Sequence, residues 1–527
     1  MRTLMSATGI ALSEHPSDSS LPMATLPSLP EDLIRLIAEW IVCDDLDRGC
    51  LVWGEEQNAY RLLLPLSESC KPLRAYMKPL IFKTLHNWNI DGESVWPQDL
   101  WPHVVTVKLR DHVAQDQAVL KVTQDVYTAL TQMPLLTNAI LRYNSVVPPA
   151  ALQSLGAVTN LKTLEIHQAR LDGLLLSSLS FPLLEKLVVT ITGFRGISRA
   201  NDIDRAAERA NVGRLLRCVS RNLTFLHLSG DLMPVDFDKI RWPRLQSLAV
   251  SEHTPSRQLL VPALTAHMPS LCDLQLLYAA DMSRTSEGLR PPFAYGDPAG
   301  RSLRHILPRL TALSLSNVSD DDPIFSQLPE SLNALHIHAR CDPHYGADHA
   351  DLPKPAVAAL SNASAIVLVK RLSFLSDLIE FTISVNEFPT APLFDTIASR
   401  FPRLTYLEAS RANYQQRRDG WDCTGRVTRN DTVLNAMSRF PRLRTLKLTL
   451  HTVESSRRSN MELGETLRRL FGGIASLQTV YFPWFFEPPW LPWQTPDPET
   501  WDSYDRGVLD QWPCRESPQP VGVPIVL

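Results

Sequence analysis

The chain has 527 residues, of which 44% are hydrophobic and 20% are charged, so it can bury a core and is not a disordered polypeptide. Its 52 Lys and Arg residues nearly balance 56 Asp and Glu residues, which gives a formal net charge of −4. This balance excludes the basic composition typical of proteins that bind nucleic acid or an anionic membrane, and we expect neither as a partner.

The N-terminal residues lack the features of a targeting segment. Residues 1–25 hold a single Arg and a short, broken apolar stretch, so we predict a disordered leader rather than a secretion signal. The apolar run AIVLV (365–369) ends at Lys370, far short of the roughly 20 residues that a membrane span needs. Eight scattered cysteines form no CxxC pair and indicate reduced thiols. We therefore expect a cytoplasmic and/or nuclear protein.

Residues 26–90 predict a small all-α module. In SLPEDLIRLIAEWIV (28–42), Ser28 and Glu31 have the spacing of a capping box, and Pro30 suits a first helical turn. Apolar residues then recur at helical spacing on one face: Leu33, Leu36, Ile37, Trp40 and Ile41. A second apolar segment follows at 62–85, so the module has enough apolar surface for a small core.

Leu29-Pro30-x-Asp32-Leu33-Ile34, with Ile37 four residues after Leu33, resembles the opening helix of an F-box. The segment LSESCKPLRAYMKPLIFKTL (66–85) is similar to the later F-box helices. The resemblance implies docking on the Skp-type adaptor of a cullin–RING ubiquitin ligase, with these candidate contacts: Leu29, Pro30, Leu33, Ile34 and Ile37. The alternative is a helical cap that shields the core of the first repeat that follows.

One motif, an apolar residue followed by others three and five positions later, recurs thirteen times between Val104 and Phe482. Two copies are FPRLTYLEA (401–409) and FPRLRTLKL (440–448), in which the first apolar residues are Leu404 and Leu443. Six steps between copies span 22–26 residues, three span 39 and one spans 46. The longer steps indicate loop insertions, and the step of 46 could also hide a degenerate repeat.

The last two apolar residues of each copy alternate, as on the buried face of a short strand. Helical segments precede several copies, for example at 204–220, 431–440 and 463–477. The Pro of each FP pair disfavours helix, so it ends the helix and begins the turn into the strand. Over residues 100–485 this order resembles the leucine-rich repeat superfamily, which implies an α/β solenoid with parallel strands on the concave face and helices on the convex face.

The motifs of phosphate loops, zinc proteases and serine hydrolases do not occur, so we predict neither an enzyme nor a cofactor. The segment LHIHARCDPHYGADHAD (335–351) contains residue types that can ligate zinc, namely His336, His338, Cys341, His344 and His349. Since HxH before a loop is not a specific metal signature, we predict no metal, with a metal-dependent enzyme as the alternative. SDDDP (319–323) lacks the spacing of a calcium loop and predicts a solvated turn.

Residues 486–527 are rich in Pro and Trp, including Trp490, Trp493 and Trp501. We predict an aromatic cap that closes the last repeat, with a Pro-rich peptide ligand as the alternative.

The strand positions between the buried ones face the concave surface, which is the usual binding face of a solenoid. They mix charged, imidazole and aromatic side chains without a basic stripe, which suits a protein partner. Our candidates for substrate binding are Glu165, His167, Phe225, His227, Asp273, Gln275, His336, His338, Tyr406 and Glu408.

These features together predict a substrate-receptor subunit of a Skp–cullin–F-box type ubiquitin ligase. The N-terminal helices would bind the adaptor, and the repeats would bind a protein substrate of unknown identity. Such a receptor acts by raising the effective concentration of substrate at the ligase, without catalysis of its own. The alternative is a leucine-rich repeat scaffold with a helical N-cap and no ligase role.

Overall fold

A computed structural model describes residues 30, 33–34, 63–64, 67–86, 97–110, 125–143, 145–173, 179–190, 204–252, 259–278, 293–294, 302–339, 359–411, 428–448, 468–483 and 501–505. The chain divides into two units between Lys83 and Thr84, which we name unit 1 and unit 2. The expected leader and most of the expected first helix lie outside the described residues.

Unit 1 is helical in most of its described residues. Its helix α3 (Lys71–Ile81) begins with a Pro in its first turn, where a missing N–H leaves no helical hydrogen bond unmade. Four side chains form its core, each no more than 2% exposed: Ile34, Leu63, Leu73 and Met77. This core therefore packs Ile34 and Leu63 against helix α3, which contributes Leu73 and Met77.

Unit 2 is built on one sheet of fifteen strands, whose order in space follows the chain. Every neighbouring pair is parallel except the last, in which β17 runs antiparallel to β16. The strands are β1 (Thr84–His86), β2 (Thr106–Arg110), β3 (Asn138–Arg142), β4 (Thr163–His167), β5 (Lys186–Thr190), β6 (Phe225–Ser229), β7 (Ser247–Glu252), β9 (Asp273–Tyr278), β11 (Ala312–Ser316), β12 (Ala334–His338), β13 (Glu380–Val385), β14 (Tyr406–Arg411), β15 (Thr445–Leu448), β16 (Thr479–Pro483) and β17 (Trp501–Asp505). A two-stranded sheet pairs β8 (Leu259–Leu260) with β10 (Phe293–Ala294).

All thirteen copies of the motif form neighbouring strands in register. Leu313 on β11 pairs with Leu335 on β12, which pairs with Phe381 on β13, and each is fully buried. The third apolar positions form a second buried row, as at Leu315 and Ile337. These rows bury the apolar surface of each repeat against its neighbours, which is the main stabilising term of such an array.

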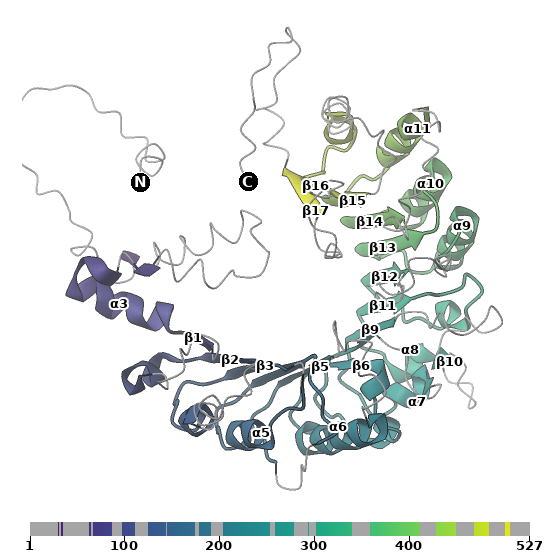
Figure 1. The fold of residues 1–527 in the computed structure, drawn as a ribbon. Helices are drawn as coiled ribbons and strands as arrows, with labels where there is room; N and C mark the ends of the chain where they lie inside the picture. The colour runs from purple at the N-terminus through teal and green to yellow at the C-terminus, as the bar shows by residue number, and fades with distance from the viewer. Residues whose placement is uncertain are drawn as a thin grey trace, which may run out of the picture. The chain divides into compact units, whose positions relative to one another are not determined.

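The helices of unit 2 lie on one side of its curved sheet, the convex side (Figure 1). They are α5 (Pro149–Gly156), α6 (Arg205–Val219), α7 (Val261–Thr265), α8 (Leu303–Ile306), α9 (Asn362–Arg371), α10 (Ala391–Arg400) and α11 (Thr428–Met437), with the 3₁₀ turns η3 (Gln98–His103), η5 (Gly230–Leu232), η6 (Phe237–Lys239) and η7 (Pro323–Ser326). The expected α/β leucine-rich repeat solenoid is confirmed.

The FPRL segment forms the junction between helix and strand. Helix α10 ends at Arg400, and the N–H of Phe401 donates to the carbonyl of Ile397 at 2.9 Å. Phe401 is fully buried and its ring centroid lies 5.3 Å from that of Phe381 on β13. Arg403 is solvent-exposed and pairs with Asp377 at 2.9 Å. Each such turn therefore ties one repeat to the one before it.

Polar side chains buried under the sheet fix α6. Glu208 accepts a hydrogen bond from the backbone N–H of Leu171 at 3.0 Å, and Asn211 donates to the carbonyl of the same residue at 2.6 Å. Both side chains are nearly inaccessible to solvent. Asp204 caps the helix through the N–H groups of Ala206 and Ala207. The two side chains thus satisfy both backbone groups of Leu171, as a neighbouring strand would, and attach the helix to the turn after β4.

The sheet extends past both expected limits of the solenoid. β1 precedes residue 100, and β17 follows residue 485. No strand of the sheet lies between β12 and β13 in the step of 46 residues, because the two are hydrogen-bonded neighbours. In SDDDP, Asp322 is 4% exposed and accepts a hydrogen bond from the N–H of Ile324 at 3.2 Å, so this one side chain of the turn is buried, whereas Ser319, Asp321 and Pro323 are exposed as a solvated turn requires. Among the described residues, none of the helices is long and apolar enough to cross a membrane.

Candidate protein-binding surface

The strand side chains of unit 2 that alternate with the buried rows form a polar surface away from the helices. We name it the open face. All ten side chains proposed for substrate binding lie on it, and each is half-buried. They sit on strands spaced about 4.8 Å apart, so their relative positions are set by the register of the sheet. Whether any of them contacts a substrate stays a prediction.

Glu165 connects two neighbouring strands of the open face. Its Oε1 accepts a hydrogen bond from Lys186 Nζ on β5 at 2.8 Å, and its Oε2 lies 3.2 Å from His167 Nε2. The hydrogen bond from His167, then that from Lys186, lowers the pKa of Glu165 to about 2, against the opposing effect of burial. Glu165 is therefore an ion-paired structural carboxylate at neutral pH.

Three histidines of the open face are each bonded to a hydroxyl group on the next strand. The pairs are His167 with Thr190, His227 with Ser251, and His336 with Thr382, at 2.8, 2.6 and 2.8 Å. All three hydroxyl side chains are buried between strands. A substrate cannot approach these oxygens, so the pairs orient the imidazole rings and do not form an accessible nucleophile.

The side chain of His336, the first of the residues considered for zinc, is 22% exposed. Burial lowers its pKa, and the charges of Glu380, Glu408 and Asp273 oppose that effect only in part. The rings of His336 and His338 lie 6.2 Å apart. Cys341, His344 and His349 lie outside the described residues. In the part of the chain that the structure describes, no three His, Cys, Asp or Glu side chains are grouped to hold a metal ion.

The other candidates form local polar clusters. Asp273 accepts hydrogen bonds from Ser247 at 2.8 Å and from Gln275 at 3.0 Å. Tyr406 donates to Glu408 at 2.8 Å, and Lys447, whose Nζ lies 4.0 Å from the same carboxylate, also lies over the Tyr406 ring. Lys447 and Ser247 are not among the ten predicted substrate-binding residues, although both alternate with buried residues on their strands.

Charge is distributed unevenly along the open face. Strands β1–β5 carry four cationic side chains, Lys108, Arg110, Arg142 and Lys186, and one acid, Glu165. Strands β6–β13 carry no Lys or Arg, and their acids are Glu252, Asp273 and Glu380. A partner segment bound along the sheet therefore meets a positive potential at β1–β5 and a negative potential at β6–β13.

The candidate adaptor contacts of unit 1 separate into buried and exposed positions. Leu33 is 45% exposed, whereas the adjacent Ile34 is 1% exposed and belongs to the core of unit 1. Pro30 is also exposed and accepts hydrogen bonds from the N–H groups of Leu33 and Ile34. Leu29 and Ile37 lie outside the described residues. Of the described candidates, only Leu33 and Pro30 offer surface to a partner in this conformation.

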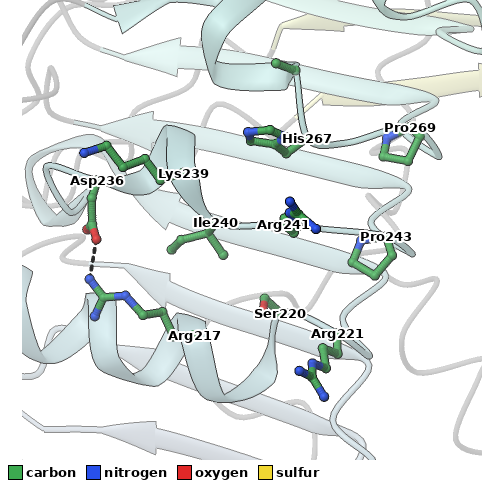
Figure 2. Close-up of a pocket in the computed structure, with 11 residues that line it drawn as sticks. Arg217, Ser220, Arg221, Asp236, Lys239, Ile240, Arg241, Pro243, His267 and Pro269 are labelled. Carbon is green, nitrogen blue, oxygen red and sulfur yellow. Dashed lines mark hydrogen bonds and ion pairs between the residues drawn. The ribbon is translucent and has the colours of Figure 1, made fainter.

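A second surface, absent from the sequence analysis, is a groove at the edge where strands β6, β7 and β9 begin (Figure 2). Its volume is about 870 Å³. It is lined by Arg217, Ser220, Arg221, Asp236, Lys239, Ile240, Arg241, Pro243, Ala266, His267 and Pro269. The only sequence signal for it is the recurrence of cationic residues in the turns of neighbouring repeats. We name it the cationic groove.

No protein-family model matches the sequence, and no curated protein matches it either. Among solved structures, the chain is similar to one from the yeast Rad7 and Elc1 complex, with 12% identity, a TM-score of 0.34, and coverage of 88% of this chain and 93% of that one. It is also similar to the leucine-rich repeat-containing protein LegL7 from Legionella pneumophila, with 12% identity, a TM-score of 0.30, and coverage of 72% and 90%. At these TM-scores neither likeness indicates a partner.

Proposed function

We propose that this chain is a protein-binding receptor that holds its partner on the open face. The observation that carries the proposal is the open face itself, an in-register array of half-buried charged, imidazole and aromatic side chains. Each strand presents only two or three of these side chains, so a specific partner has to contact several neighbouring strands. Mixed polarity with aromatic side chains is typical of the surfaces that bind proteins.

We further propose that unit 1 docks on the Skp-type adaptor of a cullin–RING ubiquitin ligase, so that the partner on the open face becomes a substrate. Support comes from the F-box-like residues 29–37 and from the exposure of Leu33 beside the buried Ile34. An exposed leucine next to a buried core position is the arrangement that helix-in-groove docking uses. The receptor then contributes effective concentration, and the chemistry belongs to the ligase.

The test is co-purification of the full chain with the Skp-type adaptor of its source organism. Leu33→Asp is the test variant, because its side chain is exposed and its loss leaves the core of unit 1 intact. The matched control is Leu135→Asp, an equally drastic change at a leucine that is 53% exposed in unit 2. We expect adaptor binding by the wild type and the control, and its loss in Leu33→Asp.

The outcome separates the two candidate functions. If the wild-type chain does not bind the adaptor, or if Leu33→Asp binds as well as the control, the ligase role is wrong. Unit 1 is then a helical cap of the array, as solenoids require at their ends. The open face would still be the binding surface of a scaffold, because that proposal rests on unit 2 alone.

A further inference from the structure

The cationic groove carries more positive charge than its own acid can balance. Four cations line it, and its one acid, Asp236, is ion-paired with Arg217. The hydrogen bond from Arg217 lowers the pKa of Asp236, against an opposing effect of burial. Among the described residues, Arg221, Lys239 and Arg241 make no hydrogen bond or ion pair through their side chains. Three positive charges therefore remain in the groove, in a chain whose formal net charge is −4.

The backbone that presents these cations is firmly held. Between Arg241 and Pro243, Trp242 is fully buried, and its ring centroid lies 5.3 Å from that of the buried Phe237. The N–H of Trp242 donates to the carbonyl of His267 at 3.0 Å, which joins the turns of two neighbouring repeats. Figure 2 shows Arg241 between Arg221 and His267. The cations therefore project from an ordered edge, and little backbone entropy is lost when a ligand binds.

Only some of the four cations of the groove can be explained by a stabilising effect on helix α6. The C-terminus of a helix carries partial negative charge, which favours cations in its last turn. Arg217 lies in the last turn of α6 and Arg221 follows its end. Lys239 belongs to η6, and Arg241 to the turn before β7. The helix dipole does not explain these last two cations, and neither has an ion-pair partner in the described residues.

We propose that the cationic groove binds a phosphorylated serine or threonine side chain of a partner protein. All four cations line the same cavity, which favours a compact, multiply charged anion over an extended polyanion such as nucleic acid. A phosphoryl group carries about 1.5 to 2 negative charges at pH 7, and guanidinium groups bind it through paired hydrogen bonds. Ile240, Pro243 and Pro269 supply apolar walls for the residues that flank the phosphorylated position.

The site is independent of the proposed receptor function. It lies at the edge where the strands begin and includes none of the open-face candidates. It also belongs to unit 2, whereas the residues assigned to the adaptor belong to unit 1. Phosphorylation would thus control a second contact between this chain and a partner protein, whether or not that partner is a ligase substrate.

The experiment uses the full chain and a degenerate peptide library with one fixed, central phosphoserine. The same library without the phosphoryl group is the comparison. Both libraries are passed over the immobilised chain, and the affinities of retained peptides are then measured by fluorescence anisotropy. We expect enrichment of the phosphorylated library and, for selected peptides, a dissociation constant that rises on the order of tenfold or more in the double variant Arg221→Ser, Arg241→Ser. Unchanged circular dichroism and melting temperature establish that this variant is folded.

The matched control is Arg309→Ser, Arg442→Ser, which removes the same charge from exposed turns outside the groove. It should bind phosphopeptides like the wild type. Equal retention of the two libraries, or equal affinity of the groove variant and the control, would overturn the proposal. Vesicles containing a phosphoinositide and a single-stranded oligonucleotide are measured in parallel. Binding of either that is tighter than that of the peptides and lost in the groove variant would assign the groove to that ligand instead.

Discussion

Arg110 and Arg142 lie directly opposite each other on the parallel strands β2 and β3. Like charges that face each other across a strand pair repel, and here burial, followed by the charge of Arg142, lowers the pKa of Arg110. Strands β1–β3 carry no Asp or Glu. The pair therefore places two positive charges side by side at the first strands of the open face.

The first prediction concerns this pair. Arg142→Gln should leave the free energy of unfolding unchanged or raise it by up to about 0.5 kcal/mol, because it removes a repulsion. It should also weaken the binding of a Glu-rich peptide, most strongly at low salt. Urea unfolding and anisotropy titrations measure the two effects. The control is Arg442→Gln, in an exposed turn. A destabilised Arg142→Gln that keeps its peptide affinity would show that Arg142 has a structural role.

The second prediction concerns the buried Asp322, whose pKa is raised by burial to about 7. The folded state keeps a proton that the unfolded state loses near pH 4, so this group's contribution to stability is present below pH 4 and lost as the pH rises to 7. Asp322→Asn keeps the oxygen that caps η7 and cannot ionise. Relative to wild type, its free energy of unfolding should rise by on the order of 2 kcal/mol from pH 5 to pH 8.

Urea unfolding at the two pH values measures this difference. Asp321→Asn is the control, because Asp321 is exposed and adjacent in sequence. A constant difference between Asp322→Asn and wild type from pH 5 to pH 8 would contradict the assignment of a raised pKa to Asp322.

The third prediction concerns Glu165, whose pKa shift and pH dependence of stability have the opposite sign to those of Asp322. The folded-state pKa of Glu165, about 2, lies below its ordinary value of 4.5, so its contribution is present above pH 4.5 and lost as the pH falls towards 2. Glu165→Gln should destabilise unit 2 by about 1 kcal/mol at pH 7, and the cost should shrink towards pH 3. Glu185→Gln serves as the control, since Glu185 is half exposed and only 3.9 Å from the exposed Lys162. Equal costs at pH 7 for the two variants would refute the prediction.

The fourth prediction tests the attachment of α6. Asn211→Ala removes a buried donor and leaves the carbonyl of Leu171 without it, so it should cost about 2 kcal/mol. Asn160→Ala removes a similar bond, 2.9 Å long, from an exposed Asn to the carbonyl of Pro134. Because water replaces that bond, we expect a cost below about 1 kcal/mol. Urea unfolding followed by circular dichroism compares the two, and an equal cost would mean that burial does not decide the effect.

The buried rows of the sheet could be predicted from the sequence because they depend only on local alternation. Leu335 and Ile337 are two residues apart, so they share a face whatever the neighbouring strands are. The partners across the sheet could not be predicted in the same way. His336 bonds to Thr382, which is separated from it by the longest step of the array, and the local pattern carries no information on that distance.

The two proposed binding surfaces also differ in whether local sequence alternation predicts them. The open face follows from alternation, so the strand positions of its ten candidates could be predicted. The cationic groove is assembled from the end of a helix, a 3₁₀ turn and two strand-entry turns, each of which is an ordinary polar turn in the sequence. In unit 1, helical spacing put Leu33 and not Ile34 on the apolar face, whereas Ile34 is the buried residue of the pair. One helical position is about 100° of rotation, so a small error in phase exchanges inside and outside.

The reversed strand β17 has a consequence for how copies of this chain can associate. A parallel sheet offers unpaired backbone groups at both edges, and identical chains could join there end to end into a fibre. At one edge β17 runs against β16, so an added copy would meet a strand of the wrong direction for continuing the parallel ladder (Figure 1). At the other edge β1 has three residues and few groups to pair. An added copy would therefore have to pair with a three-residue strand at one edge or with a reversed strand at the other, so the parallel ladder of one chain does not simply continue into the next.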